Sequence, residues 1–340
     1  MLSRLGFGKS YRQFVSPVRK MSNYFTADSQ TQPVTTPITT STIFLTLTFE
    51  SPLKADVIKK TLSQLHTYKR EINSQYPESN IVYVAGLGTS AWQSLFGKTL
   101  PQPKDLHDFK ALKGAGGEAP STPGDLFLHI RSEEMAVCFE FAARIAEQLG
   151  DAAKIVDEVH SFKYHDSRNV LGFVDGSGNP ETPEEVQDST VITSKEDDKF
   201  VGGSYVITQK YFHDMAKWKQ LPVDYQENII GRHKKSDEEF DDDAKKSWAH
   251  NNLTEIIDEN GEQHEILRDN MPFGDISKNE FGTFFIGYSK RPWVTEKMLD
   301  NMFIGDPVGN YDRLLDYSTA VTGNLFFCPT LDFLEHAEQF

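Results

Sequence analysis

The residue whose surroundings best suit acid–base chemistry is Asp175. It follows the apolar segment 170–174, and the chain then continues as GSGNP. This change of composition predicts a buried strand that gives way to a turn, with the carboxylate at the junction. A carboxylate there either accepts bonds from nearby backbone N–H groups in an Asx-type turn or moves a proton for a bound substrate. For an isolated Asp-Gly pair the turn is the more common outcome.

Three residues of the second half could meet Asp175 across a pocket: His250, Arg268 and Asp312. Each also has an ordinary interpretation. A single histidine is usually a surface or satisfied core residue, an arginine in a charged segment is usually solvated, and an aspartate before a helix is usually a cap. Taken singly, these residues therefore do not indicate an active site.

Length and composition indicate a soluble α+β protein of about two domains, at ~150 residues per domain. The 340 residues contain 50 acidic and 35 basic side chains, a formal charge of −15, which argues against a nucleic-acid partner. The apolar runs are shorter than the ~20 residues that cross a bilayer, so no membrane span is predicted. Cys138 and Cys328 form neither a disulfide framework nor a metal cluster, which favours a reducing or neutral compartment.

The first 27 residues are basic and Ser-rich and contain no acidic residue before Asp28. This composition is typical of a mitochondrial transit peptide and predicts a mitochondrial location. The alternative is a disordered basic tail on a cytoplasmic protein. Residues 28–40 are rich in Thr, Gln and Pro, so residues 1–40 together are interpreted as a leader and extended arm.

The first half shows alternating strand periodicity and the 3–4 residue spacing of amphipathic helices. The elements follow the β-α-β-β-α-β order of a ferredoxin-like unit, with a Gly/Pro-rich loop over 100–124. The predicted elements are strand 41–50, helix 55–76, strand 81–87, strand 125–131, helix 133–149 and strand 170–174.

The second half repeats this order, although its second strand cannot be placed between residues 230 and 272. We predict domains 41–190 and 191–340, each a ferredoxin-like unit with an antiparallel sheet, and therefore an α+β fold. The predicted elements are strand 203–212, helix 214–231 despite Pro222, strand 282–288, helix 295–304 and strand 325–329.

Several segments, taken in order, resemble the dye-decolorizing peroxidase family, specifically its compact bacterial-type branch. GxxDG alone is weakly specific, whereas the ordered set covers about residues 40–334 and is strongly specific. Two departures are His233, where the family often has Thr, and the pair Asn251-Asn252. The matching features are GFVDG at 172–176, IGRHK at 230–234, His250, Arg268, GTFFIGY at 282–288 and YDRLLDYSTA at 311–320.

The resemblance implies haem b, iron protoporphyrin IX, bound in the C-terminal unit. It implies His250 as the iron ligand, with Asp312 accepting a bond from the other ring nitrogen and raising the basicity of the ligand. Asp316 is a rival for that role. Arg232 is expected either to pair with a haem propionate or to be a surface arginine at a helix end. Phe285 is expected either to line the haem pocket or simply to pack in the core.

On the peroxide-binding face, the resemblance implies three catalytic residues. Asp175 would shuttle a proton between the two peroxide oxygens, and Arg268 would stabilise the charge that develops as the O–O bond breaks. Asn270 would orient water or peroxide. The expected function is a peroxidase that reduces hydrogen peroxide and oxidises small organic electron donors, dyes and phenols, in one-electron steps through a ferryl intermediate.

Two alternatives remain open from the sequence. One is a haem carrier or iron-release protein with incidental peroxidase activity. The other is a haem-free α+β binding module. The extended arm and the sheet edges favour self-association, so a homo-oligomer, a dimer or larger, is expected.

Overall fold

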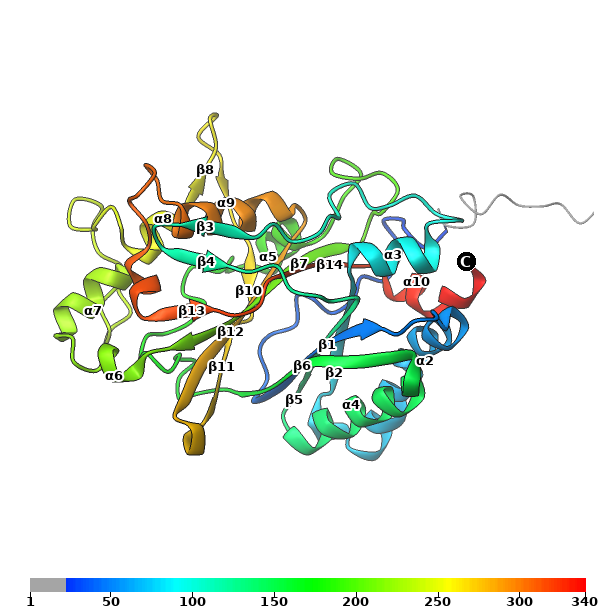
Figure 1. Ribbon diagram of the computed structural model, residues 1–340. Helices are drawn as coiled ribbons and strands as arrows, with labels where there is room; N and C mark the ends of the chain where they lie inside the picture. The colour runs from blue at the N-terminus through cyan, green and yellow to red at the C-terminus, as the bar shows by residue number, and fades with distance from the viewer. Residues whose placement is uncertain (1–22) are drawn as a thin grey trace, which may run out of the picture.

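The computed structural model describes residues 23–340, and over them the chain forms two ferredoxin-like units (Figure 1). In the first unit the strands lie in the order β2-β5-β1-β6 and all neighbours are antiparallel. This confirms the predicted plan of the first half, except for its last strand. The elements are β1 (Ser41–Phe49), α2 (Ala55–Gln75), β2 (Val82–Leu87), β5 (Leu126–Ser132), α4 (Met135–Leu149) and β6 (Ala153–Phe162).

The second unit repeats the arrangement with strand order β10-β12-β7-β14, again antiparallel. The strand that the sequence could not place is β10 (Leu267–Arg268), continued in the same register by β11 (Met271–Asp275). The other main elements are β7 (Ser204–His213), α8 (His250–Thr254), β12 (Glu280–Ser289), α9 (Pro292–Phe303) and β14 (Asn324–Cys328).

Short elements complete the fold. The hairpin β3–β4 lies beside α9 (Figure 1), while β13 extends the second sheet by pairing with β7. These elements are α3 (Thr89–Phe96), β3 (Leu112–Gly114), β4 (Gly117–Ala119), α5 (Pro183–Thr190), α6 (Met215–Trp218), α7 (Val223–Ile230), β8 (Ile256–Ile257), β9 (Gln263–His264), β13 (Ser318–Ala320) and α10 (Leu331–Glu335), with 3-10 turns at 77–79, 150–152, 276–278, 313–316 and 337–339. No helix in this part of the chain is both long and apolar enough to span a bilayer.

The two sheets join at β2 and β14, where Phe327 pairs with Leu87. Gln32 reinforces this short junction: its side-chain amide donates to the carbonyls of Ala85 and Pro329, both at 2.8 Å, and accepts from the Ala85 N–H at 2.7 Å. A buried glutamine that satisfies backbone groups on both sheets replaces ladder hydrogen bonds that the short pairing lacks.

Alternation along β12 separates the protein core from a cavity. Phe284, Ile286 and Tyr288 are buried in a cluster that includes Phe44 and Phe127 of the first sheet, and the Phe44 and Phe284 rings stack at 4.0 Å. Residues 283 and 285 face the other way, because successive side chains of a strand point to opposite faces, and both line the cavity. The second sheet is therefore the floor of the cavity.

A buried ion pair crosses between the two units. Arg131 on β5 is fully buried and donates from Nη1 to Asp269 Oδ2 at 2.7 Å. The same guanidinium also donates to the carbonyls of Thr36 and Pro33, each at 2.6 Å. These bonds, all from Nη1 and Nη2, offset much of the cost of burying the charge, although Nε has no partner within the described residues.

The predicted strand at 170–174 is wrong: this segment is a loop, and the first sheet is completed by β6 instead. Asn169 Oδ1 accepts from the N–H groups of Leu171 and Phe173, and Gly172 has φ 95°, which breaks an extended backbone. Leu171 and Phe173 nevertheless alternate inward, into a small cluster beneath Trp218. The alternating spacing of these apolar residues therefore indicates that they are buried, but it does not indicate that the segment pairs as a strand.

The predicted helix 214–231 is also divided, into α6 and α7, with Pro222 as the N-cap residue of α7. Proline lacks the N–H that a continuous helix needs and clashes with the carbonyl four residues earlier. Gln226 compensates by donating to the carbonyls of Trp218 and Leu221 at 3.0 and 3.2 Å.

The segment between β6 and β7 packs on the second unit. Most residues of the segment 169–178 line the cavity of that unit, and α5 contacts β10 and β12. The predicted division of the chain at residue 190 stays a prediction, but the segment that carries Asp175 lies against the C-terminal sheet.

Candidate active site

One cavity over the second sheet is lined by Asp175, Arg268, Asn270, His250 and Arg232. Phe285 also lines it. These residues come from the loop after β6, from β10 and the residues next to it, from α8, and from the segment after α7. The fold of the second unit and the connecting segment thus bring the candidate residues together.

Asp175 and Arg268 are connected by two side-chain amides. Asn270, between β10 and β11, donates from Nδ2 to Asp175 Oδ1 at 3.0 Å, while its Oδ1 accepts from the Ile286 N–H at 3.0 Å. Asn179, on the turn that carries Asp175, accepts at Oδ1 from the N–H and Nε of Arg268 at 3.0 and 3.2 Å. Asn179 Nδ2 also donates to the Arg268 carbonyl at 2.8 Å.

This reciprocal arrangement fixes the two charged groups without pairing them. Among the ion pairs of residues 23–340, none joins Asp175 to Arg268. Burial lowers the pKa of Arg268, and the negative charge of Asp175 opposes that shift. Guanidinium titrates so far above neutral pH that Arg268 remains a cation. The cavity therefore presents a carboxylate and a cation that a small substrate can reach between them.

His250 begins α8 and its ring lines the cavity. Its Nδ1 lies 2.6 Å from Asp312 Oδ2, and the Asp312 side chain is fully buried. Asp312 Oδ1 accepts from the Leu314 N–H at 2.8 Å, which fixes the carboxylate. Since a carboxylate accepts, Nδ1 carries the proton, and the Nε2 lone pair is free to bind a metal.

Asp312, and not Asp316, is the partner of His250. Asp316 accepts from the Tyr311 hydroxyl at 2.8 Å and lies 3.7 Å from Arg313. The two carboxylates are four residues apart in a 3-10 turn, so only one of them can face the histidine.

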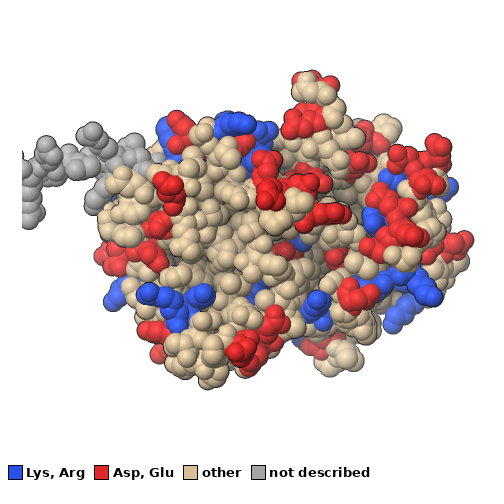
Figure 2. Space-filling view, turned by 180° about the vertical axis from the view of Figure 1, so that it is seen from behind, with Lys and Arg blue, Asp and Glu red and all other residues tan. Residues whose placement is uncertain are grey.

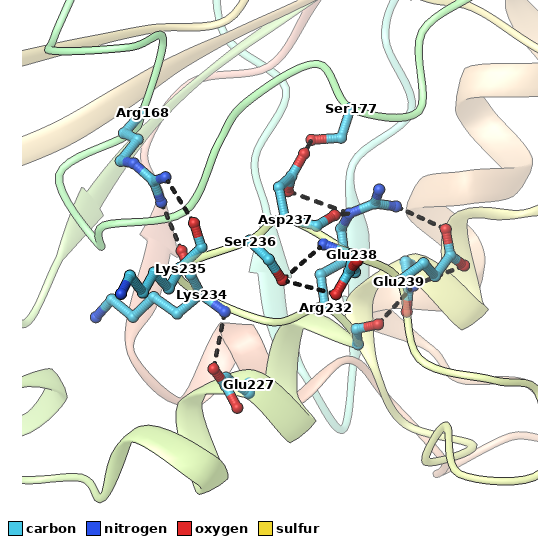
Figure 3. Close-up of polar contacts among 12 residues, drawn as sticks. Arg168, Ser177, Glu227, Arg232, Lys234, Lys235, Ser236, Asp237, Glu238 and Glu239 are labelled. Carbon is cyan, nitrogen blue, oxygen red and sulfur yellow. Dashed lines mark hydrogen bonds and ion pairs between the residues drawn. The ribbon is translucent and has the colours of Figure 1, made fainter.

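Arg232 lines the cavity and belongs to a loop over residues 231–240, which also carries Asp237 and Glu239 (Figure 3). Its Nε donates to the carbonyl and Oδ1 of Asp237 at 3.0 and 3.2 Å, and its Nη1 to Glu239 Oε2 at 2.6 Å. Gly231 precedes it with φ 89°, and an added Cβ would lie 1.8 Å from Asn251 Oδ1, so only glycine fits there. Asn251, one of the departures noted in the sequence, thus packs against the Arg232 segment.

The cavity fits a haem group. It offers one histidine with a free nitrogen backed by a buried carboxylate, and an arginine that can meet a carboxylate. The rest of the lining is mainly apolar, as a porphyrin face requires. The apolar side chains are Leu171, Phe173, Val174, Ile230, Ile266, Phe285, Met298, Leu299, Met302, Leu314 and Leu315.

Residues 31–163 match the description "Dyp-type peroxidase, N-terminal", and residues 166–333 match "Dyp-type peroxidase, C-terminal". The dye-decolorizing peroxidase of Rhodococcus erythropolis is 50% identical over 304 residues, covering 89% of this chain and 88% of that protein. This chain belongs to the dye-decolorizing peroxidase family. The relative from Mycobacterium tuberculosis is 49% identical over 305 residues, 90% of each chain.

A solved structure of this family agrees with the fold. A variant of DypB from Rhodococcus jostii RHA1, in complex with heme, has a TM-score of 0.86 and 45% identity, covering 89% of this chain and 97% of that chain. The predictions of a ferredoxin-like α+β fold, a peroxidase and a haem cofactor are confirmed by these relatives. The carrier alternative is not favoured, since the curated relatives are named as peroxidases.

The predicted mitochondrial location is wrong. Four curated relatives that match most of this chain come from bacteria, and this finding contradicts the prediction. A short basic, Ser-rich segment has a composition that many unrelated tails share, so it carries little information by itself. Most of that segment, residues 1–22, lies outside the described residues.

Two residues that hold the site together were not identified from the sequence: Asn179 and Asp237. Asn179 lies in the quoted GSGNP turn, where an amide flanked by Gly and Pro was interpreted only as turn chemistry. Asp237 lies in a charged stretch that looks solvated. A polar residue that binds another residue's backbone or side chain leaves no periodic signal.

Proposed function

We propose that this peroxidase reduces hydrogen peroxide and oxidises small organic donors, dyes and phenols, one electron at a time, with Asp175 and Arg268 as its catalytic residues. The main support is that the side-chain amides of Asn270 and Asn179 hold Asp175 and Arg268 in the cavity by hydrogen bonds, without a direct ion pair between the two charged groups. Haem supplies the iron centre at which peroxide is reduced. The protein residues bind, orient and move protons around it.

Asp175 is the proton carrier in this proposal. Asn270 occupies Oδ1, and no hydrogen bond reaches Oδ2 within residues 23–340, so that oxygen is available to take a proton from peroxide. The same oxygen then returns the proton to the departing oxygen, which leaves as water. A general base must lie within hydrogen-bond reach of the proton that it takes, and the fixed turn provides that geometry.

Arg268 stabilises negative charge as the O–O bond breaks. A half-buried, permanently protonated guanidinium at the wall of a cavity acts more strongly there than in bulk water, because less solvent screens it. Asn270 positions the carboxylate through its bond to the Ile286 N–H, and so holds the distance between proton carrier and cation.

His250 holds the iron through Nε2, and Asp312 keeps its ring oriented and basic. A strongly donating histidine favours the oxidised metal. Arg232 binds a haem carboxylate, and Phe285 lines the porphyrin surface. Arg232 already has two acidic neighbours, so its remaining Nη2 group is the one offered to the cofactor.

The test uses Asp175→Asn and Arg268→Leu in the haem-loaded protein. Each change should lower kcat/KM for peroxide by about 10²–10³-fold, the usual effect of removing a charge-stabilising or proton-transfer group. Haem content, measured by the Soret absorbance, should stay unchanged. Wild-type rates in both variants would remove these residues from the mechanism.

The acidic surface favours cationic and neutral donors. On the face shown in Figure 2, acidic side chains are most numerous over the second unit, where Lys and Arg lie among them, and the chain carries a formal charge of −15. A cationic dye should therefore show a kcat/KM that falls with ionic strength, whereas an anionic dye of similar potential should show the opposite trend.

We also propose that the protein self-associates. β6 is the outer strand of the first sheet, and within residues 23–340 no further strand pairs with it in that sheet. A ten-residue edge strand is a ready surface for pairing with another chain. Light scattering on the purified protein decides this, and a monomer at micromolar concentration would contradict it.

A further inference from the structure

A loop over residues 231–240 links Arg232 to the turn that carries Asp175. The loop is closed by backbone bonds, from Phe240 N–H to the Gly231 carbonyl at 3.0 Å and from His233 N–H to the Glu238 carbonyl at 2.8 Å. Arg168 connects the loop to the preceding segment by donating from Nη1 to the Lys234 carbonyl at 2.6 Å (Figure 3). The same Nη1 donates to the Gly172 carbonyl at 3.0 Å.

Asp237 is the residue at which this loop meets the Asp175 turn. Its Oδ2 accepts from the Ser177 hydroxyl at 2.6 Å, while its Oδ1 and carbonyl oxygen accept from Arg232 Nε at 3.2 and 3.0 Å (Figure 3). One side chain therefore binds the serine two positions after Asp175 and the arginine that faces the cofactor cavity.

The backbone of Asp237 is held in an unfavourable conformation. Its φ of 64° lies in the left-handed region, which residues with a side chain seldom adopt, although Asp and Asn tolerate it better than most. Such conformations persist where surrounding contacts over-determine them, and they cluster at functional sites. Here the left-handed turn is what presents both the carboxylate and the carbonyl oxygen to Arg232.

Arg232 is oriented from outside the cavity. Asp237 binds its Nε and Glu239 its Nη1, while Nη2 makes no hydrogen bond within the described chain. A guanidinium fixed before the ligand arrives loses less freedom on binding a carboxylate. The Asp237 carboxylate thus prepares the cofactor contact and holds the Asp175 turn at the same time.

We propose that Asp237 is a positioning residue that couples binding of the haem carboxylate at Arg232 to ordering of the turn 175–179. The inference rests on the proposed function, in which Arg232 meets that carboxylate and Asp175 moves the proton. Coupling of this kind is reciprocal, so cofactor binding orders the turn and an ordered turn strengthens cofactor binding.

The readout is amide hydrogen exchange of a peptide covering residues 172–180, in the haem-free and haem-loaded protein, together with the Kd for haem. Two amides in this region report on the turn: that of Asp175, bonded to the Ser167 carbonyl, and that of Asn179, bonded to the Gly176 carbonyl. In the wild type, haem should slow their exchange.

Three variants separate the contributions of Asp237. Asp237→Gly relieves the left-handed backbone but removes the side chain, and should weaken haem binding about ten-fold and abolish the haem-dependent protection of the turn. Ser177→Ala removes only the link to the turn, and should abolish the protection and weaken haem binding by the coupling alone, less than Asp237→Gly does because Arg232 keeps its own contacts to Asp237. Asp237→Asn keeps the backbone conformation without the charge and should fall between the wild type and Asp237→Gly.

The matched control is Asp243→Asn, an exposed carboxylate on the same acidic stretch with no hydrogen bond or ion pair within residues 23–340. It should behave as wild type. Wild-type protection of the turn in both Asp237→Gly and Ser177→Ala would overturn the proposal, and so would a change in haem Kd with protection retained. If Asp237→Gly does not fold, Ser177→Ala and Asp237→Asn decide the question.

Failure of the proposed function would look different. A wild-type protein that binds no haem, or that binds haem without reacting with peroxide, would contradict the enzyme assignment. Haem binding and peroxide turnover in the wild type, combined with unaltered exchange in the variants, would contradict only the role of Asp237.

Discussion

Replacing Asn179 with alanine tests whether the position of Arg268, and not merely its presence, determines reactivity with peroxide. The change removes three hydrogen bonds to Arg268, at 2.8, 3.0 and 3.2 Å. Each backbone group left without a partner costs about 1–3 kcal/mol when it stays dry. Asn179 is half-buried and water can partly replace it, so we expect a loss of about 1–2 kcal/mol in the free energy of unfolding.

The effect on catalysis should be separate from the loss of stability, because the variant remains folded while Arg268 loses its orientation. Arg268 keeps its charge in the variant but loses the bond that orients Nε, so we expect kcat/KM for peroxide to fall about ten-fold, less than the 10²–10³-fold of removing a stabilising group. Asn179→Asp retains acceptors for the Arg268 N–H and Nε but cannot donate to its carbonyl. It should therefore recover part of the activity.

The assay is the initial rate of dye oxidation against peroxide concentration, at matched haem content, with unfolding by urea measured in parallel. Asn228→Ala is the control, because this asparagine on α7 is half-buried like Asn179 and its side chain bonds only to the Asp224 carbonyl. If Asn179→Ala lowers stability as expected and leaves kcat/KM for peroxide at the wild-type value, the positioning argument is refuted.

Three further predictions follow from groups elsewhere in the structure. Arg131→Met leaves Asp269 buried without its cation and should lower the free energy of unfolding by about 3–5 kcal/mol, whereas the double variant Arg131→Met/Asp269→Leu should recover much of that loss in urea titrations. Asp312→Asn should weaken haem binding about 10–100-fold in absorbance titrations, while His250→Ala should abolish the iron–histidine signal in resonance Raman spectra even if some haem remains bound. Burial lowers the pKa of His213 to about 4, so the native state binds fewer protons than the unfolded chain between about pH 6.5 and 4; stability should fall by about 1–3 kcal/mol as pH decreases across that window, and His213→Gln should lack this component.

Periodic burial was the part of the fold that could be predicted. Helix α2 and strand β1 were predicted almost to the residue, because their apolar spacing matches the element that they form. The same rule failed at 170–174, where Leu171 and Phe173 alternate inward from a loop, and Asn169 binds backbone groups that a strand would have offered to a neighbour. Periodicity identifies which side chains are buried, and it does not identify the hydrogen-bond partners of the backbone.

Site residues could be predicted from the sequence only where the chemical type of a residue allows few roles. The resemblance indicated His250 and Asp175, yet the sequence left Asp312 and Asp316 as rivals, because both are carboxylates near the same turn. The choice depends on which carboxylate also receives the Leu314 N–H, a property of the folded 3-10 turn. Residues such as Asn179 and Asp237, which only orient another site residue, are still harder to predict. Their role depends on a hydrogen bond to a residue far away in the sequence.

The buried ion pair between Arg131 and Asp269 connects the first unit to the candidate active site, although no residue of the first unit lines the cavity. Every residue of the cavity lies between positions 169 and 318, whereas Arg131 lies on β5 of the first sheet. Its partner Asp269 stands between Arg268 and Asn270, whose side chains line the cavity while that of Asp269 points into the core. Because alternate residues of an extended segment face opposite sides, anchoring Asp269 from below restrains both of its neighbours. The first unit therefore supports the geometry of Asp175, Asn270 and Arg268 from the far side of the sheet, which gives a physical reason for the two units to remain in one chain.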